Sequence, residues 1–95
     1  MSRAFVKEDG AEPPPRYSLP PREDTGFPLA AARALLAGAN LGDSASAEDA
    51  TGYRWGDPRL EAEVRRLRAE AIAGENDRME SLADRYLRAA GLTAE

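Results

Sequence analysis

The fold of this chain is decided around one stretch, Gly52-Tyr53-Arg54-Trp55-Gly56-Asp57-Pro58-Arg59-Leu60, which runs on to Arg65-Arg66-Leu67-Arg68. The stretch holds the only Trp and one of the three Tyr, with a glycine on either side of the aromatic pair. Asp57 followed by Pro58 predicts a helix start, because an Asp side chain caps the first turn and proline suits the first helical position. We therefore expect an aromatic turn that leads directly into a helix.

Apolar residues recur at helical spacing downstream of this turn, at Leu60, Val64, Leu67 and Ala71, and Gly74 is expected to end the helix. A further helix should begin at Asn76 or Asp77 and be capped by Gly91. Its apolar side is formed by Met79, Leu82, Ala83, Tyr86, Leu87 and Ala90. We expect this last helix to fold back and bury the apolar stripe of the helix before it.

A helix is also predicted upstream of the turn, beginning at Pro28 and about 11 or 12 residues long. Its apolar stripe is Ala32, Leu35, Leu36 and Ala39. Gly38 weakens its end and Gly42 stops it. Residues 42–52 should form a polar loop that contains one helical turn. Ser46 and Asp49 resemble a capping box at the start of this turn, and Gly52 is expected to end the turn.

No segment alternates as a strand would, so residues 27–92 should form an all-α domain, a small bundle of about three short helices. The tail, residues 1–26, is expected to be disordered, because five of the seven prolines lie within residues 9–24. The Phe5-Val6 pair near its start is either disordered or a short partner-binding element.

Composition excludes several kinds of chemistry. The chain has no Cys and no His, which removes thiolate chemistry and the commonest general base and metal ligand. The net charge of −4 argues against general nucleic-acid binding, so no direct sequence-specific contact with nucleic acid is expected. No apolar run reaches membrane-spanning length and the N-terminus does not resemble a secretory signal, so we expect a cytoplasmic protein that binds no membrane.

Three groups of residues are candidates for function. Asp43, Glu48 and Asp49 are either solvated loop residues with capping roles or an acidic tip that faces a metal or a partner. Tyr53 and Trp55 are either core anchors or a docking surface, and Arg54 between them could stack on either ring.

The third group is Arg65, Arg66 and Arg68, which form either a salt-bridged solvated face or a docking patch. Arg65 can reach Glu61, and Arg66 can pair with acidic residues three or four positions away on the same helix. Arg68 could face Glu61 or the neighbours of Glu63 only through a longer reach. Exposed pairs of this kind contribute little energy.

The order Tyr-x-aromatic-Gly-x-x-Arg-Leu from Tyr53, followed by Arg65 to Arg68, resembles the start of the second coiled-coil helix of the Gre transcript-cleavage factors of bacterial RNA polymerase, GreB-type members especially. Residues 1–8, Met-Ser-Arg-Ala-Phe-Val-Lys-Glu, resemble the opening of GreB-type chains, and Leu41-Gly42-Asp43 resembles the start of their hairpin tip. These matches cover about a third of the chain.

In that family, two carboxylates at the hairpin tip help the polymerase to hold the Mg²⁺ that activates water for RNA cleavage. The resemblance assigns the first carboxylate to Asp43. The second has no clean match, since Glu48 lies five residues on and Asp49 follows where the family has Asn. The first helix is shorter than the family's, and the C-terminal β-rich domain has no counterpart after residue 70. The resemblance therefore implies a shortened and divergent relative.

Our leading hypothesis is a non-catalytic accessory protein, without a cofactor, that contacts RNA polymerase. A second hypothesis is a Mg²⁺-dependent stimulator of transcript cleavage that shares the polymerase's metal through Asp43 and Glu48. A third is a helical protein-interaction adaptor with no link to transcription.

Overall fold

The computed structural model describes residues 17–92, and all regular structure in this range is helical. Four α-helices follow one another, α1 (Phe27–Asn40), α2 (Ser44–Thr51), α3 (Glu61–Ala73) and α4 (Asp77–Ala89), with a short 3₁₀ turn η2 (Pro58–Leu60) directly before α3. The predicted helical class is confirmed. The described range holds four helices instead of three, because residues 44–51 form a complete helix where a single turn was expected.

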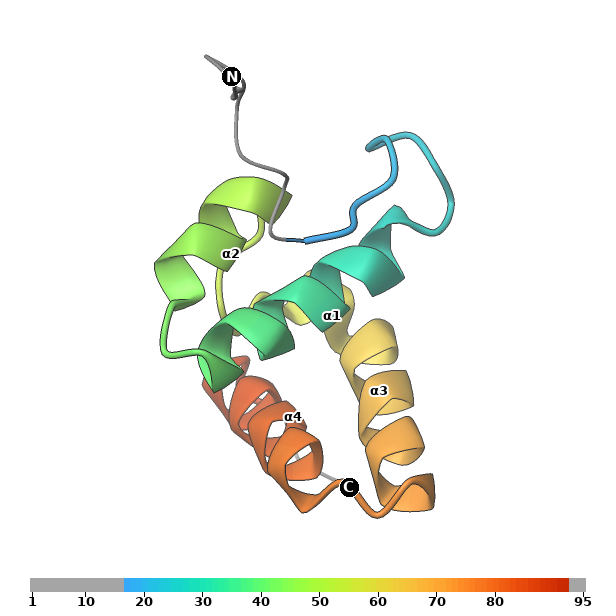
Figure 1. The fold of residues 1–95 in the computed structure, drawn as a ribbon, viewed down its shortest axis with the longest axis vertical. Coiled ribbons are helices and arrows are strands. Elements are labelled where there is room, and N and C mark those ends of the chain that lie inside the picture. The colour runs from blue at the N-terminus through green and yellow to red at the C-terminus, as the bar shows by residue number, and fades with distance from the viewer. Residues whose placement is uncertain (1–16, 93–95) are drawn as a thin grey trace, which may run out of the picture.

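The bundle consists of two packed pairs. α3 packs mainly against α4, and α1 packs mainly against α2 while also touching α3 and α4 (Figure 1). The core is formed by alanines and leucines of α1, the apolar stripes of α3 and α4, and Ala47 of α2. Leu60, Val64 and Leu67 are buried, so the prediction that the last helix folds back over this stripe is confirmed.

α1 and α2 approach closely at one glycine. A Cβ atom built on Gly38 would lie 2.7 Å from the Cβ of Ala47 and 3.1 Å from the hydroxyl oxygen of Tyr17. Gly38 was expected only to weaken the end of α1. It also permits α2 to lie close to α1, because a side chain at position 38 would collide with Ala47.

The ends of the helices follow local capping chemistry. The Asp43 carboxylate accepts a hydrogen bond from the amide of Ser46, so the cap of α2 is Asp43 and the prediction that Ser46 caps this segment is wrong. Gly52 ends α2 in a left-handed conformation with φ of 80°, as predicted. Asp57 and Asn76 accept hydrogen bonds at the starts of η2 and α4, in agreement with the sequence analysis.

The chain after α4 turns at Gly91, which has φ of 79°. The amide of Gly91 donates to the carbonyl of Arg88, and the amide of Leu92 donates to the carbonyl of Leu87. This pair of bonds is a Schellman motif, so the predicted glycine cap of the last helix is confirmed.

The chain before α1 lies partly against the domain. Tyr17 is 9% exposed, and Leu19 packs against the core. Residues 17–26 were assigned to the tail, whereas packing in the structure already includes Tyr17. The Phe5-Val6 pair and the first three prolines of the tail lie outside the described residues.

Among the described helices, none has the length and apolar composition needed to cross a membrane.

Candidate interaction surface

The aromatic turn after α2 connects several helices. The backbone amide of Trp55 donates to the Glu48 carboxylate at 2.8 Å, which ties the turn to α2. The Trp55 ring meets Tyr86 of α4 edge-on, with 5.0 Å between ring centroids. Tyr53 lies near Phe27 of α1, with centroids 6.4 Å apart. Tyr53 and Trp55 therefore anchor the core, and both also remain partly exposed.

The cation beside these rings is not the one predicted. The guanidinium of Arg59 lies 4.9 Å from the centroid of Tyr53 and pairs with the Asp57 carboxylate at 2.8 Å. Arg54 could have stacked on either ring according to its position in the sequence, but it is exposed, and the cation over the Tyr53 ring is Arg59. The hydrogen bond from the Arg59 side chain lowers the pKa of Asp57 below its ordinary value.

Tyr86 links α4 to the start of α3. Its side chain is fully buried, and its hydroxyl donates to the backbone carbonyl of Asp57 at 2.9 Å. Burial, followed by the nearby Asp57 carboxylate, raises the pKa of Tyr86 to about 12. The neutral phenol is therefore held as a structural donor.

The acidic candidates do not converge on one point. The Asp43 carboxylate caps the start of α2, and the Glu48 carboxylate accepts from Trp55. Asp43 lies before the helix as its cap, whereas Glu48 is five residues further on, which is about 7.5 Å along the helix axis. Asp49 is exposed further along α2. In the described part of the chain, no three acidic side chains gather closely enough to hold a metal ion.

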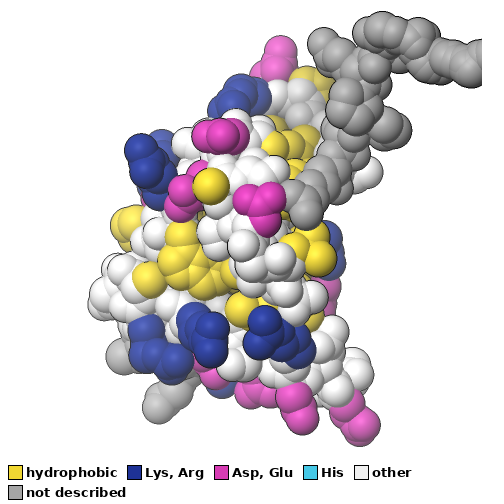
Figure 2. Space-filling model, turned by 60° about the vertical axis from the view of Figure 1, so that its left-hand side comes forward, with side chains coloured by type: hydrophobic (Ala, Val, Ile, Leu, Met, Phe, Trp, Pro, Cys, Tyr) yellow, Lys and Arg dark blue, Asp and Glu magenta, His cyan; other side chains and the backbone are white. Residues whose placement is uncertain are grey.

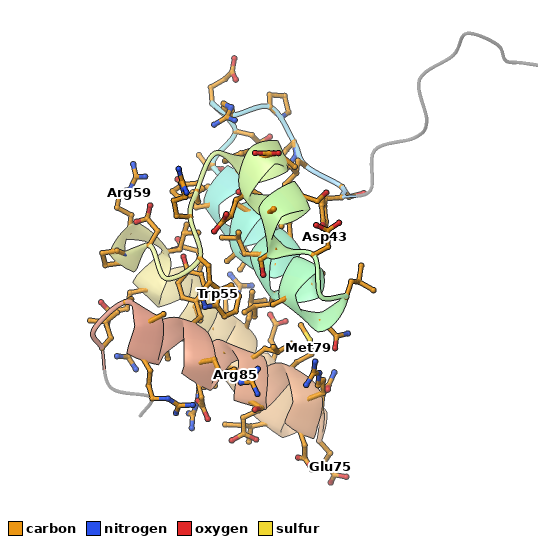
Figure 3. All side chains as sticks on the ribbon, turned by 90° about the vertical axis from the view of Figure 1, so that its left-hand side faces the viewer. Asp43, Trp55, Arg59, Glu75, Met79 and Arg85 are labelled. Carbon is orange, nitrogen blue, oxygen red and sulfur yellow. The ribbon has the colours of Figure 1, made fainter. Side chains whose placement is uncertain are left out.

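These acids instead border a surface that also includes part of α4. We call this region the α2–α4 face and define it by its elements. The acidic rim is on α2 and its cap (Asp43, Glu48, Asp49), the apolar centre is in the neighbouring turns (Leu41, Trp55), and the basic rim is on α4 (Arg78, Arg85, Arg88). Trp55 joins the two helices, since its amide donates to Glu48 and its ring meets Tyr86. Figure 2 shows hydrophobic side chains in the middle of one side of the molecule, with acidic and cationic groups above them and a row of cations below, beyond which further acidic groups lie. Figure 3 shows Trp55 between α2 and α4, with Asp43 and Arg85 on the same side of the molecule.

The basic rim follows one side of α4. Arg78 and Arg85 are seven residues apart, which places them on the same side of a helix, and Arg88 follows three residues later. Arg78 donates to the side-chain oxygen of Asn40 at 2.8 Å. Arg85 and Arg88 are exposed and form no ion pair within residues 17–92. None of these three arginines is among the residues predicted from the sequence to form a site, although their spacing is visible in the sequence.

The arginines of α3 lie elsewhere and are mostly paired. Arg65 forms the expected ion pair with Glu61 at 2.9 Å, and Arg66 lies 3.6 Å from Glu70. Arg68 has acidic partners, since it binds Asp84 and approaches Glu80 of α4 at 3.8 Å. α3 is separated from α2 by the rest of the bundle (Figure 1), so Arg65 and Arg66 do not belong to the α2–α4 face.

No protein-family model, curated protein or solved structure matches this chain.

Proposed function

We propose that this chain is a non-catalytic protein-binding module that docks a protein partner through the α2–α4 face. The observation that carries the proposal is the partly exposed Trp55 at the centre of a face with charged rims. Trp and Arg are the residues most often found at energetic hot spots of protein interfaces, and charged rims set orientation and association rate. The rims of the face are on α2 with its cap and on α4, and Trp55 in the turn after α2 is fixed by its contacts with Glu48 and Tyr86, so little ordering is needed on binding.

The carboxylates support docking better than metal chemistry. Asp43 is used as a helix cap, and Glu48 is used to hold the aromatic turn. Transcript cleavage would require both carboxylates to reach one ion, whereas each of them accepts a hydrogen bond from a different backbone amide, Asp43 from Ser46 and Glu48 from Trp55. We therefore do not propose the cleavage-stimulating function, and we expect no Mg²⁺-dependent stimulation of RNA cleavage by the purified chain.

RNA polymerase is the first partner to test, and this part of the proposal rests on the resemblance of Tyr53–Arg68 to the Gre factors. The similarity to the Gre factors lies in the sequence, whereas the arrangement of the helices differs. Leu41-Gly42-Asp43 leads into α2, whereas the family has the tip of a long hairpin at this point. The mode of docking proposed here therefore differs from insertion of a coiled coil.

The test measures binding of the full chain to purified bacterial RNA polymerase by biolayer interferometry. Arg85→Glu reverses a charge on the basic rim and should weaken binding by about tenfold, which corresponds to ~1.4 kcal/mol. Arg66→Glu makes the same charge change on α3 and should leave the affinity within about twofold.

Absence of binding by the wild-type chain would refute RNA polymerase as the partner. Equal loss of affinity in both variants would refute the α2–α4 face as the docking surface.

A further inference from the structure

The α2–α4 face is electrostatically self-complementary. Its acidic rim is on α2 and its cap, its basic rim is on α4, and Trp55 lies between these two helices (Figure 3). A twofold axis that runs along the apolar centre, in the plane of the interface, would place the acidic rim of one copy against the basic rim of the other. A twofold interface contains each contact two times, so the acidic rim of each copy would face the basic rim of the other. Both of these contacts would be favourable.

The charged side chains available for these contacts are exposed. Asp49 and Arg85 are both solvent-exposed, and neither forms an ion pair within the described chain. Glu48 and Arg78 already form hydrogen bonds within the same chain. Their charges would strengthen the negative potential of the acidic rim and the positive potential of the basic rim while these hydrogen bonds are kept. An interface that pairs Asp49 with a guanidinium of the basic rim costs no existing ion pair.

The apolar centre also lacks cover in the isolated chain. Leu41, in the turn before Asp43, is 60% exposed and Trp55 is partly exposed. In the described residues, Ile72 on α3 is the other large aliphatic side chain left exposed. A second copy would cover Leu41 and Trp55 together, and burial of apolar surface is the main favourable term in such an association.

We infer that the free chain pairs with a second copy of itself through the α2–α4 face, as a twofold dimer. The inference rests on the proposed function, because it assigns a second occupant to the same docking face. Dimerisation would hide this face, so a protein partner and self-association would compete.

The test is sedimentation velocity of the full chain over a micromolar to millimolar concentration series. The wild-type chain should form a dimer that weakens as salt rises, since salt screens exposed charges. Arg85→Glu and Asp49→Arg should each raise the dimer dissociation constant by about tenfold or more, because each reversal creates two like-charge contacts per dimer. Arg66→Glu, on α3, is the control and should dimerise as the wild type does.

The decisive arm is a mixture of the two variants. A heterodimer of Arg85→Glu with Asp49→Arg restores opposite charges in both contacts, so the mixture should dimerise although neither variant does so alone. A chain that stays monomeric throughout the series, or variants whose mixture gives no rescue, would overturn the inference.

The results distinguish a chain that does not dimerise from a chain that does not bind RNA polymerase. A monomeric chain that binds RNA polymerase in an Arg85-dependent way retains the docking role and refutes only the dimer. A dimer that is rescued by charge exchange but binds no polymerase supports the dimer and refutes the polymerase partner.

Discussion

Removal of one hydroxyl group, in Tyr86→Phe, tests whether the aromatic turn is fastened to α4 as described. The Tyr86 hydroxyl donates to the Asp57 carbonyl at 2.9 Å from a fully buried position. The same carbonyl also accepts from the amide of Leu60 at 3.2 Å, so it keeps one donor in the variant. The net loss should therefore be that of an ordinary hydrogen bond, about 1 kcal/mol of unfolding free energy.

The assay is urea unfolding followed by the fluorescence of Trp55, which is the only tryptophan and lies against Tyr86. A loss of about 1 kcal/mol corresponds to a fall of about 4–8 °C in Tm for a domain of this size. Tyr53→Phe is the matched control. The Tyr53 hydroxyl makes no hydrogen bond within residues 17–92, so the control should change stability by less than about 0.5 kcal/mol.

Two results would refute this reasoning. One is a Tyr86→Phe variant as stable as the wild type, and the other is an equal loss in both variants. Either result would mean that the hydroxyl of Tyr86 does not hold the start of α3 to α4.

Three further predictions concern the fold. Gly38→Ala should destabilise the domain by about 1–3 kcal/mol, because its Cβ would meet Ala47, whereas Gly74→Ala, whose Cβ has ordinary contacts, should be near neutral in the same urea assay. Asp43→Ala should cost about 1 kcal/mol in thermal unfolding and Asp43→Asn much less, since Asn also caps helices; equal losses would contradict the capping role. Because the pKa of Tyr86 is raised to about 12, the contribution of the neutral phenol to the free energy of unfolding should be fully present below pH 10 and be lost as the pH rises through about 12. Circular dichroism of the unfolding transition would detect this loss, and unchanged stability across this range would contradict it.

Local signals in the sequence predicted most of the helix boundaries. Asp57 with Pro58 marks the start of η2, and Gly52, Gly74 and Gly91 mark helix ends as expected. Helix starts and ends of this kind can be predicted from the sequence, because each depends on only a few neighbouring residues.

α2 was underestimated because its stability comes from elsewhere in the chain. The segment Ser44–Thr51 has a weak apolar stripe, and it is held by Ala47 against Gly38 of α1 and by Glu48 against the amide of Trp55. Tyr17 was missed for a similar reason, since an isolated aromatic beside prolines gives no periodic signal. Both contacts depend on tertiary packing.

The candidate surface was only half visible from the sequence. The acidic residues and Trp55 were singled out, but the arginines of α4 were not. The spacing of residues within α4 can suggest the basic rim, whereas only the arrangement of the helices brings Asp43 and Arg85 to the same side of the molecule (Figure 3). The pairing of Arg68 with Asp84 likewise required knowledge of how α3 and α4 pack.

The most direct test of docking through the α2–α4 face is an amide NMR spectrum of the isotope-labelled full chain with substoichiometric RNA polymerase. We predict that the signals of Leu41, Trp55 and Arg85 lose intensity first, while those of Arg65 and Arg66 on α3 persist. Selective loss of the α3 signals, with the α2–α4 face unaffected, would contradict the account.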